Sequence, residues 1–191
     1  MRQLRMERTR EAIQREALRL IASQGYDATT CEQVAAAAEV SPATLFRYFP
    51  TKEDLVLHDV YDPMIAEAVR ARPPRESGVT AVRRALVDVF ADIYDVDLEH
   101  VRQRTALILS VPALKSRSLE QQQSLVAHLI EALAERAGSS RDDLAVEVTA
   151  SACAASLGVA VGRWVRHGGD LRVHVDEAMA ALATLATRAS R

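Results

Sequence analysis

The apolar positions of the first 60 residues follow helical spacing, with clear start and stop signals between segments. Apolar side chains recur every three or four residues over 8–24 and Gly25 follows them, which predicts an amphipathic helix with a glycine C-cap. Thr30 and Gln33 have the spacing of a capping box, so a second, shorter helix is predicted to begin there and to end near residue 40.

A third helix is predicted to begin where Ser41 can cap it and Pro42 takes the first helical position, at which a missing N–H costs no hydrogen bond. This helix ends at Phe49 because Pro50 disfavours continuation, and Thr51 then caps a fourth helix. Two short helices joined by a turn of about three or four residues are typical of a helix-turn-helix.

The third helix has two different faces. Leu45 and Phe49 lie four residues apart and are predicted to pack on the first two helices. Arginine can bridge guanine acceptors, threonine can meet a thymine methyl group or a phosphate, and tyrosine can reach the DNA backbone, so the outward face suits a major groove. An ordinary solvated face is the alternative interpretation. The outward residues are Pro42, Ala43, Thr44, Arg47 and Tyr48.

The rest of the chain is also predicted to be helical, which makes an all-α fold of about nine helices. Pro63 is expected to kink the fourth helix, which ends in the segment 72–78. Ser140 and Asp143 have the spacing of a capping box at the start of the eighth helix. The five helices after the fourth are expected over about 79–94, 98–111, 118–137, 141–167 and 171–187.

Composition supports a helical, globular chain. Only 7 glycines and 6 prolines occur in 191 residues, and 49% of the residues are hydrophobic. The first ten residues are charged and contain no apolar core, so no secretory signal is predicted and a cytoplasmic location is expected. Cys31 and Cys153 lie far apart and the five histidines are scattered, so neither a metal site nor a cofactor is expected.

Charge is distributed unevenly along the chain. Residues 1–52 carry eight Arg or Lys against six Asp or Glu, whereas the remainder carries 16 against 20. A mildly basic N-terminal part on an acidic body is compatible with binding a polyanion at that end.

The segment GYDATTCEQVAAAAEVSPATLFRYFPTKEDL, residues 25–55, resembles the DNA-binding domain of TetR-family transcriptional regulators. The features that carry the resemblance are the threonine pair before the second helix, the VS turn, TL followed by an aromatic residue, and YFPTKEDL. The resemblance implies a helix-turn-helix DNA-binding domain over 1–52 and a larger helical ligand-binding and dimerisation domain over 53–191. It also implies a double-stranded DNA operator as partner, and repression that a small molecule relieves.

The resemblance also implies individual DNA contacts. Thr30 and Lys52 should hold phosphates, which the free N–H groups of helix N-termini favour independently. Glu39 stands where the family often has glycine, so the turn must tolerate a side chain, and Phe46 replaces a frequent tyrosine whose hydroxyl meets a phosphate. The complete set of expected DNA-binding residues is Thr30, Ser41, Pro42, Ala43, Thr44, Arg47, Tyr48 and Lys52.

Three arginines, Arg2, Arg5 and Arg8, precede or open the first predicted helix. They resemble the basic arms that reach a neighbouring minor groove. A frayed, solvated terminus is the alternative.

The last two predicted helices carry features of a helix-pairing surface. The segment 150–162 consists almost entirely of small residues, which allows another helix to approach closely, and apolar residues of 175–185 follow a three-four spacing. A homodimer through the helices at about 141–167 and 171–187 would form a four-helix bundle, in agreement with the family resemblance. Such a dimer places two reading heads on the half-sites of a palindrome.

The segment 102–129 resembles TetR-like regulators with a C-terminal domain of the mycofactocin-regulator type, some of which respond to long-chain acyl-CoA. An arginine beside an apolar cavity can pair with a phosphate or a carboxyl-like group of such an effector. Surface or ion-paired arginines and a tryptophan in the core are the alternatives. The candidate ligand-binding residues are Arg102, Arg104, Leu107 and Trp164.

No catalytic motif stands out in the sequence. Because it contains no nucleophile elbow, P-loop, paired-glycine fingerprint or acid–base constellation, the chain is not predicted to be an enzyme. The competing hypothesis is a small-molecule-binding or scaffolding helical protein whose first three helices only resemble a DNA-reading head.

Overall fold

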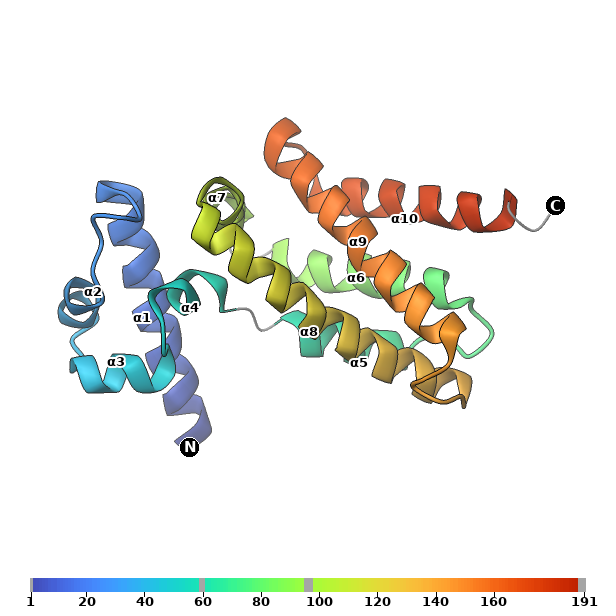
Figure 1. Ribbon diagram of the computed structural model, residues 1–191, viewed down its shortest axis with the longest axis horizontal. Helices are drawn as coiled ribbons and strands as arrows, with labels where there is room; N and C mark the ends of the chain where they lie inside the picture. Colours follow the sequence, from blue (N-terminus) through green and yellow to red (C-terminus); the bar gives the residue numbers. More distant parts are fainter. Residues whose placement is uncertain (1, 59–60, 95–97, 189–191) are drawn as a thin grey trace. The chain divides into compact units, whose positions relative to one another are not determined.

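The described part of the chain consists of helices and the loops that join them. The computed structural model describes residues 2–58, 61–94 and 98–188. Within these ranges it contains ten helices and no strand (Figure 1), so the predicted all-α class is confirmed. The helices are α1 (Arg2–Gln24), α2 (Cys31–Ala37), α3 (Pro42–Tyr48), α4 (Lys52–Leu57), α5 (Tyr61–Arg70), α6 (Gly78–Tyr94), α7 (Leu98–Ser110), α8 (Pro112–Ala137), α9 (Leu144–His167) and α10 (Leu171–Arg188).

These helices form two compact units. The N-terminal unit comprises Met1–His58 and Ala106–Ser118, and the larger unit comprises Asp59–Thr105 and Leu119–Arg191. The first segment of the N-terminal unit therefore continues to His58, whereas the sequence predicted a domain boundary at residue 52. The physical reason is that α4 is part of the N-terminal core, in which its Leu55 is 1% exposed.

A small apolar core holds α1 to α4 together in the N-terminal unit. Leu45 and Phe49 are 0% and 1% exposed, which confirms the predicted inner face of the third helix. Burying a side chain of this size stabilises a fold by about 1.5–3 kcal/mol. The members of this core are Ile13, Ala17, Val34, Ala35, Leu45, Phe49 and Leu55.

A second apolar cluster attaches the segment Ala106–Ser118 to the same unit. Leu114 of α8 is 0% exposed within it, and Leu107, Ile108 and Val111 pack against it partly buried. The sequence did not predict this attachment, because apolar residues at these positions suit a ligand cavity equally well. The partners of Leu114 in the cluster are Leu18, Ile21, Tyr26, Val56 and Leu57.

Two prolines begin helices where the sequence predicted a kink and a stop. α4 ends at Leu57, and α5 starts at Tyr61, so Pro63 lies in the first turn of α5, where a missing N–H leaves no hydrogen bond unmade. Pro112 likewise takes the first position of α8, which therefore begins there and not near residue 118. The separation of α4 from α5 accounts for the tenth helix.

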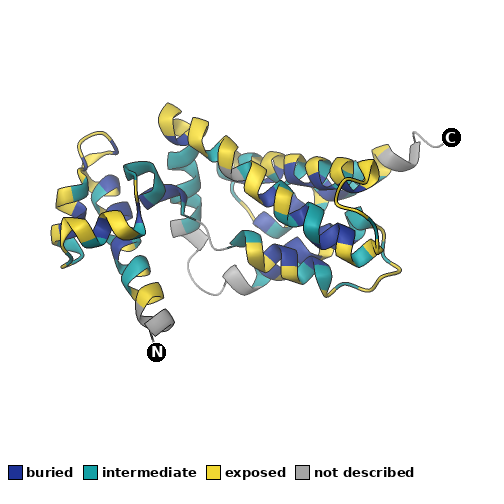
Figure 2. Cartoon of the chain, turned by 60° about the horizontal axis from the view of Figure 1, so that its bottom comes forward, coloured by how far each residue is buried: buried dark blue, intermediate teal, exposed yellow. Residues whose placement is uncertain are grey.

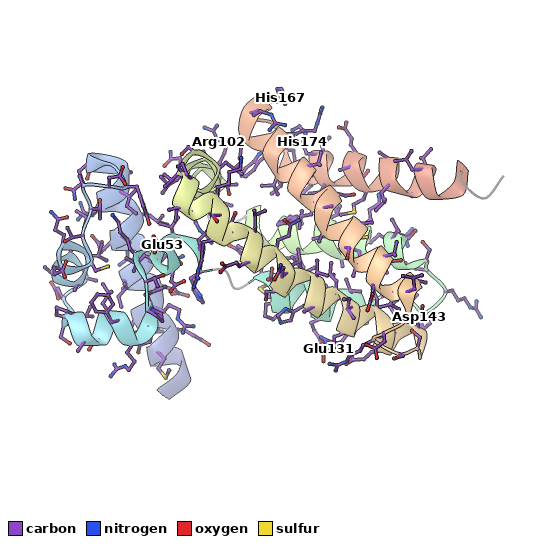
Figure 3. The ribbon with its side chains drawn as sticks, in the orientation of Figure 1. Glu53, Arg102, Glu131, Asp143, His167 and His174 are labelled. Carbon is purple, nitrogen blue, oxygen red and sulfur yellow. The ribbon has the colours of Figure 1, made fainter. Side chains whose placement is uncertain are left out.

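Two predicted helix starts are also corrected. α1 begins at Arg2, so the residues ahead of Arg8 are helical and do not form an extended arm; the side chains of Arg2 and Arg5 lie outside the described residues. The capping box predicted for Ser140 is wrong, because Asp143 is itself the N-cap of α9 (Figure 3) and accepts a hydrogen bond from the backbone N–H of Ala145 at 2.8 Å.

In the larger unit, α6, α9 and α10 pack against one another, and α5 and α8 contribute to the same core. Buried positions face the interior of each unit (Figure 2).

Trp164 is 1% exposed, and its indole Nε1 donates a hydrogen bond to the carbonyl of Gly169 at 3.0 Å. Cys153 is fully buried, which raises the pKa of its thiol to about 12. Leu119 of α8, by contrast, is 59% exposed.

The outer face of α9 is unusually apolar. In the described part of the chain, α9 is the one helix that is long and apolar enough to cross a membrane, by length and composition only. Core helices of globular proteins pass the same test, and α9 packs on α6 and α10. Val148 and Val159 of α9 are nevertheless 57% and 58% exposed.

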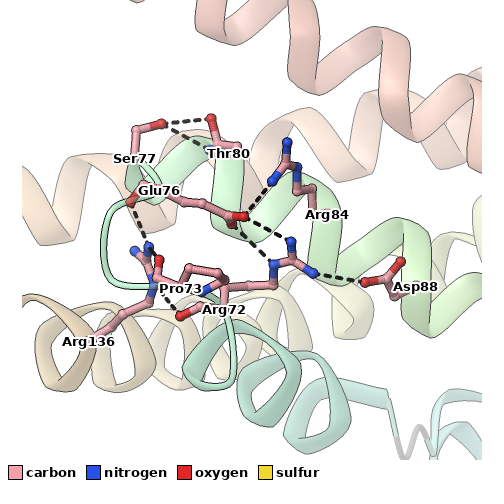
Figure 4. Close-up of polar contacts among 8 residues, drawn as sticks. All are labelled: Arg72, Pro73, Glu76, Ser77, Thr80, Arg84, Asp88 and Arg136. Carbon is pink, nitrogen blue, oxygen red and sulfur yellow. Dashed lines mark hydrogen bonds and ion pairs between the residues drawn. The ribbon is translucent and has the colours of Figure 1, made fainter.

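An ion-pair network fixes the loop between α5 and α6 (Figure 4). Glu76 accepts hydrogen bonds from Arg72 at 3.1 and 2.9 Å and from Arg84 at 2.5 Å, and Arg72 also pairs with Asp88 at 3.2 Å. Arg136 of α8 donates to the carbonyls of Arg72, Pro73 and Glu76. The loop is thus tied both to α6 and to α8.

This network predicts a loss of stability in acid. The hydrogen bond from Arg72, followed by that from Arg84, lowers the pKa of the Glu76 carboxyl to about 2. Because its pKa is lower in the folded state, Glu76 contributes stability above its ordinary pKa, and this contribution is lost as the pH falls through about 4.5 towards 2. Urea denaturation at pH 7 and at pH 3 should show a smaller acid-induced loss for Glu76→Gln than for wild type; equal losses would contradict the role of this carboxylate.

Candidate nucleic-acid interface

Helices α2 and α3 are started by the side-chain caps that the sequence predicted. The Thr30 hydroxyl accepts a hydrogen bond from the N–H of Gln33 at 3.2 Å, and the Gln33 side chain accepts one from the N–H of Thr30 at 2.9 Å. Ser41 accepts from the N–H of Thr44 at 3.2 Å, and Pro42 occupies the first position of α3. Both helices therefore have fixed N-termini, which sets the direction in which their free N–H groups point.

The turn between α2 and α3 depends on Glu39. Its φ of 53° is the one left-handed backbone conformation of a non-glycine residue in the described chain. The N–H of Val40 closes the turn by donating to the carbonyl of Ala35 at 2.9 Å. The expectation that this turn tolerates a side chain in place of glycine is confirmed, at a conformational cost of about 1–2 kcal/mol.

The threonine pair before α2 serves two different purposes. Thr29 is 2% exposed, and its hydroxyl donates to the carbonyl of Gly25 at 2.8 Å, so it fixes the loop after α1. Thr30 is exposed at the N-terminus of α2. Its hydroxyl is occupied as an acceptor by the capping box and retains its own hydrogen for a donor role.

The outward face of α3 carries the residues that the sequence placed there. Pro42, Ala43 and Arg47 are exposed, and Thr44 and Tyr48 are partly exposed. Ser41 donates to the Thr44 hydroxyl at 3.0 Å, which fixes that hydroxyl near the start of the helix. Phe46 is 43% exposed on the same short helix and so adds an apolar ring to this surface.

Lys52 lies at the start of α4 and is held by Tyr26. Its ammonium donates to the Tyr26 carbonyl at 2.6 Å and lies 4.2 Å from the centre of the Tyr26 ring, and the Tyr26 hydroxyl donates to Glu53 at 3.1 Å. Burial, with the nearby Glu53 carboxylate, raises the pKa of Tyr26 well above its ordinary value. An ammonium has three hydrogens, so Lys52 retains donors for a phosphate. Sequence spacing gave no sign of the Tyr26 contact.

A second contact that the sequence did not indicate involves Tyr48. The guanidinium carbon of Arg47 lies 5.5 Å from the centre of the Tyr48 ring, and that of Arg10, on α1, lies 5.8 Å from it. One feature of the sequence could have indicated the contact between Arg10 and Tyr48: Arg10 stands three residues before Ile13 and so lies on the buried face of α1.

The four candidate ligand-binding residues do not belong to one unit. Leu107 packs in the N-terminal unit, whereas Trp164 lies in the core of the larger unit. Arg102 (Figure 3) and Arg104 are both partly buried on α7. Their role in ligand binding stays a prediction. Within the described ranges, no group of three or more His, Cys, Asp or Glu side chains is placed to hold a metal ion.

Together, the capped α2–α3 pair, its outward polar face and the separate helical unit define a helix-turn-helix DNA-binding protein. Residues 13–58 match the family model described as bacterial regulatory proteins of the tetR family, and residues 76–187 match that of the MftR C-terminal domain. The chain belongs to the TetR family of transcriptional regulators; its members bind DNA and are not enzymes.

Individual relatives agree with this assignment. The HTH-type transcriptional regulator TcmR of Streptomyces glaucescens is 34% identical over 150 residues, which span 75% of this chain and 66% of that protein. Thermus thermophilus FadR, a TetR-family repressor solved in complex with lauroyl-CoA, is 26% identical, with a TM-score of 0.55 over 91% of this chain and 93% of that one. The SmeT–triclosan complex is similar in fold alone, at 18% identity and a TM-score of 0.60 over 91% and 90% of the two chains.

Proposed function

We propose that this regulator is a repressor that binds a palindromic operator as a homodimer and is released by a small apolar or amphipathic effector. The observation that carries the proposal is the outward face of α3, where a guanidinium, two hydroxyl-bearing side chains and two small apolar residues surround a capped helix start. Base edges in a major groove are read by side chains of these kinds. The proposed cellular location of the regulator is the cytoplasm, where bacterial DNA lies.

The proposed DNA contacts divide into two classes. Arg47 with Ala43 and Thr44 faces the base edges, whereas Thr30 and Lys52 at two helix N-termini hold phosphates. Of the remaining members, Ser41 and Pro42 set the start of α3, and Tyr48 at its end reaches the DNA backbone.

Two substitutions separate these classes. Arg47→Ala should weaken operator binding about 10- to 100-fold and relax the preference for one base pair. Lys52→Ala should weaken binding by a similar factor on operator and unrelated DNA, because phosphate contacts carry no base information. Fluorescence anisotropy on both duplexes measures this, with Arg19→Ala on α1, 59% exposed and paired with Glu16, as the control. Equal selectivity of Arg47→Ala and wild type would contradict the reading role of Arg47.

The proposed dimer surface is the outer face of α9 with α10. Val148, Ala155 and Val159 of α9 are exposed, as are Val173 and Leu185 of α10. The small side chains of α9 allow a second helix to approach closely, and two helices from each subunit form a four-helix bundle. A second copy of the chain would also cover the apolar face of α9 described above.

A charge on this surface tests the dimer. Ala155→Glu should shift the protein from dimer to monomer in sedimentation velocity. It should also abolish high-affinity binding to a palindrome, because a monomer has only one reading head for the two half-sites. Ala113→Glu, at an exposed position near the start of α8, is the control. A dimer of unchanged stability in Ala155→Glu would place the interface elsewhere.

Long-chain acyl-CoA is the first effector to test. The support is the 26% identical repressor solved with lauroyl-CoA, together with two partly buried arginines, Arg102 and Arg104, which suit phosphate groups. Lauroyl-CoA should release the operator in a competition titration, and free coenzyme A at the same concentration should not. No release would exclude this effector, and triclosan, bound by the SmeT relative, is then the next probe.

A further inference from the structure

Two arginines from different helices share one aromatic ring on the surface of the N-terminal unit. The guanidinium carbons of Arg10 on α1 and Arg47 on α3 lie 5.8 and 5.5 Å from the centre of the Tyr48 ring. The Tyr48 ring is itself packed partly buried against the core of Ile13, Leu45 and their neighbours. The core therefore fixes the position of the Tyr48 ring, and the ring makes cation–π contacts with both guanidinium groups.

Arg10 differs from Arg15 and Arg19, two other arginines of α1. It lies three residues before Ile13 and seven before Ala17, on the buried face of α1, so its aliphatic part is drawn towards α3. Its Nε is buried and has no hydrogen-bond partner among the residues that the structure describes. By contrast, Arg15 and Arg19 on the same helix contact Glu16.

Among the residues that the structure describes, no carboxylate thus accepts a hydrogen bond from the buried Nε of Arg10. Stacking on an aromatic face fixes the plane of a guanidinium, and a fixed guanidinium loses less entropy when it binds an oxyanion. Two cations on one ring also repel each other until an anion lies beside them. Both effects favour the binding of a phosphate group at this place.

We propose that Arg10, held over the Tyr48 ring, binds a DNA backbone phosphate as a positioning contact contributed by α1, while Arg47 on the same ring stays directed to the base edges. The inference rests on the proposed function, because it takes the phosphate from the operator that α3 reads. It adds a contact from outside the helix-turn-helix, which fixes the angle of α3 in the groove through a second helix. Tyr48 acts in this site as the platform for both arginines.

The test is a salt titration of DNA binding by the full chain. The affinities of wild type, Arg10→Met, Arg10→Lys and Arg15→Met are measured by fluorescence anisotropy on an operator duplex and on an unrelated duplex. Arg10→Met should weaken binding about tenfold on both duplexes and lower the slope of log K against log salt by about one per subunit. Arg10→Lys should keep the slope, and Arg15→Met, which removes the same charge from a side chain 68% exposed, should change neither quantity.

The outcomes distinguish this site from the proposed function. If wild type binds neither duplex, the proposed function fails and the site fails with it. If wild type binds and Arg10→Met keeps the wild-type slope, the phosphate site alone is overturned; a loss confined to the operator with an unchanged slope would show that Arg10 only supports α3. Partial unfolding of Arg10→Met lowers the active fraction without changing the slope, so the slope remains decisive.

Discussion

Trp164→Ala is expected to lower the free energy of unfolding of the larger unit by about 3–5 kcal/mol. The indole is 1% exposed in the core shared by α6, α9 and α10, and its N–H donates to the Gly169 carbonyl at 3.0 Å. Truncation therefore removes packing, leaves a cavity and frees a carbonyl in the turn before α10. Urea denaturation followed by circular dichroism measures the loss.

Trp164→Phe is the matched control, because it keeps an aromatic ring and removes the hydrogen bond. Its cost should be about 1–2 kcal/mol, well below that of alanine. A cost below about 0.5 kcal/mol for Trp164→Ala would contradict the core role. In that case the tryptophan would be a wall of the effector site, and lauroyl-CoA should change the fluorescence of this residue, the one tryptophan of the chain.

Leu114→Ala is expected to destabilise the N-terminal unit by about 2–5 kcal/mol. Leu114 is 0% exposed and packs with Leu18 and Ile21 of α1 and with Val56 and Leu57 of α4. Truncation therefore removes packing between this segment and both α1 and α4.

Hydrogen exchange with mass spectrometry is the appropriate measurement, because it reports each unit separately. Peptides from α1 and α4 should exchange faster in Leu114→Ala, while peptides from α9 and α10 should exchange as in wild type. Leu109→Ala, at a position 41% exposed in the same segment, is the control. Unchanged protection of α1 and α4 would contradict the attachment of this segment to the N-terminal unit.

Local signals in the sequence predicted the reading head accurately. Thr30, Ser41 and Thr51 act through hydrogen bonds to residues three positions later, and such contacts depend on spacing alone. The same holds for the inner face of α3, because Leu45 and Phe49 are four residues apart on one short helix. Helix starts of this kind need no knowledge of the tertiary structure.

The signals that misled were those with more than one local interpretation. Pro63 and Pro112 can kink a helix, end one or begin one, and the choice depends on how the chain packs on either side. Ser140 and Asp143 both have capping side chains, and the structure selects Asp143. Sequence spacing could not decide between these alternatives.

Contacts between distant residues lay beyond the sequence altogether. Lys52 contacts Tyr26, and Arg10 contacts Tyr48, only because α1, α3 and α4 fold around one core. Leu107 belongs to the N-terminal unit for the same reason, since the helix that carries it passes from one unit into the other. These long-range contacts determine which predicted DNA-binding side chains are held in place and which are free to reorient.

The outward face of α3 is expected to read DNA as part of a dimeric regulator. A mobility-shift titration of the wild-type protein on a palindromic duplex selected from a random library, with a scrambled duplex as competitor, tests this expectation. We expect a specific shift that weakens steeply with salt, because phosphate contacts release counterions. The absence of a shift at any salt concentration, or an equal shift on the scrambled duplex, would contradict it.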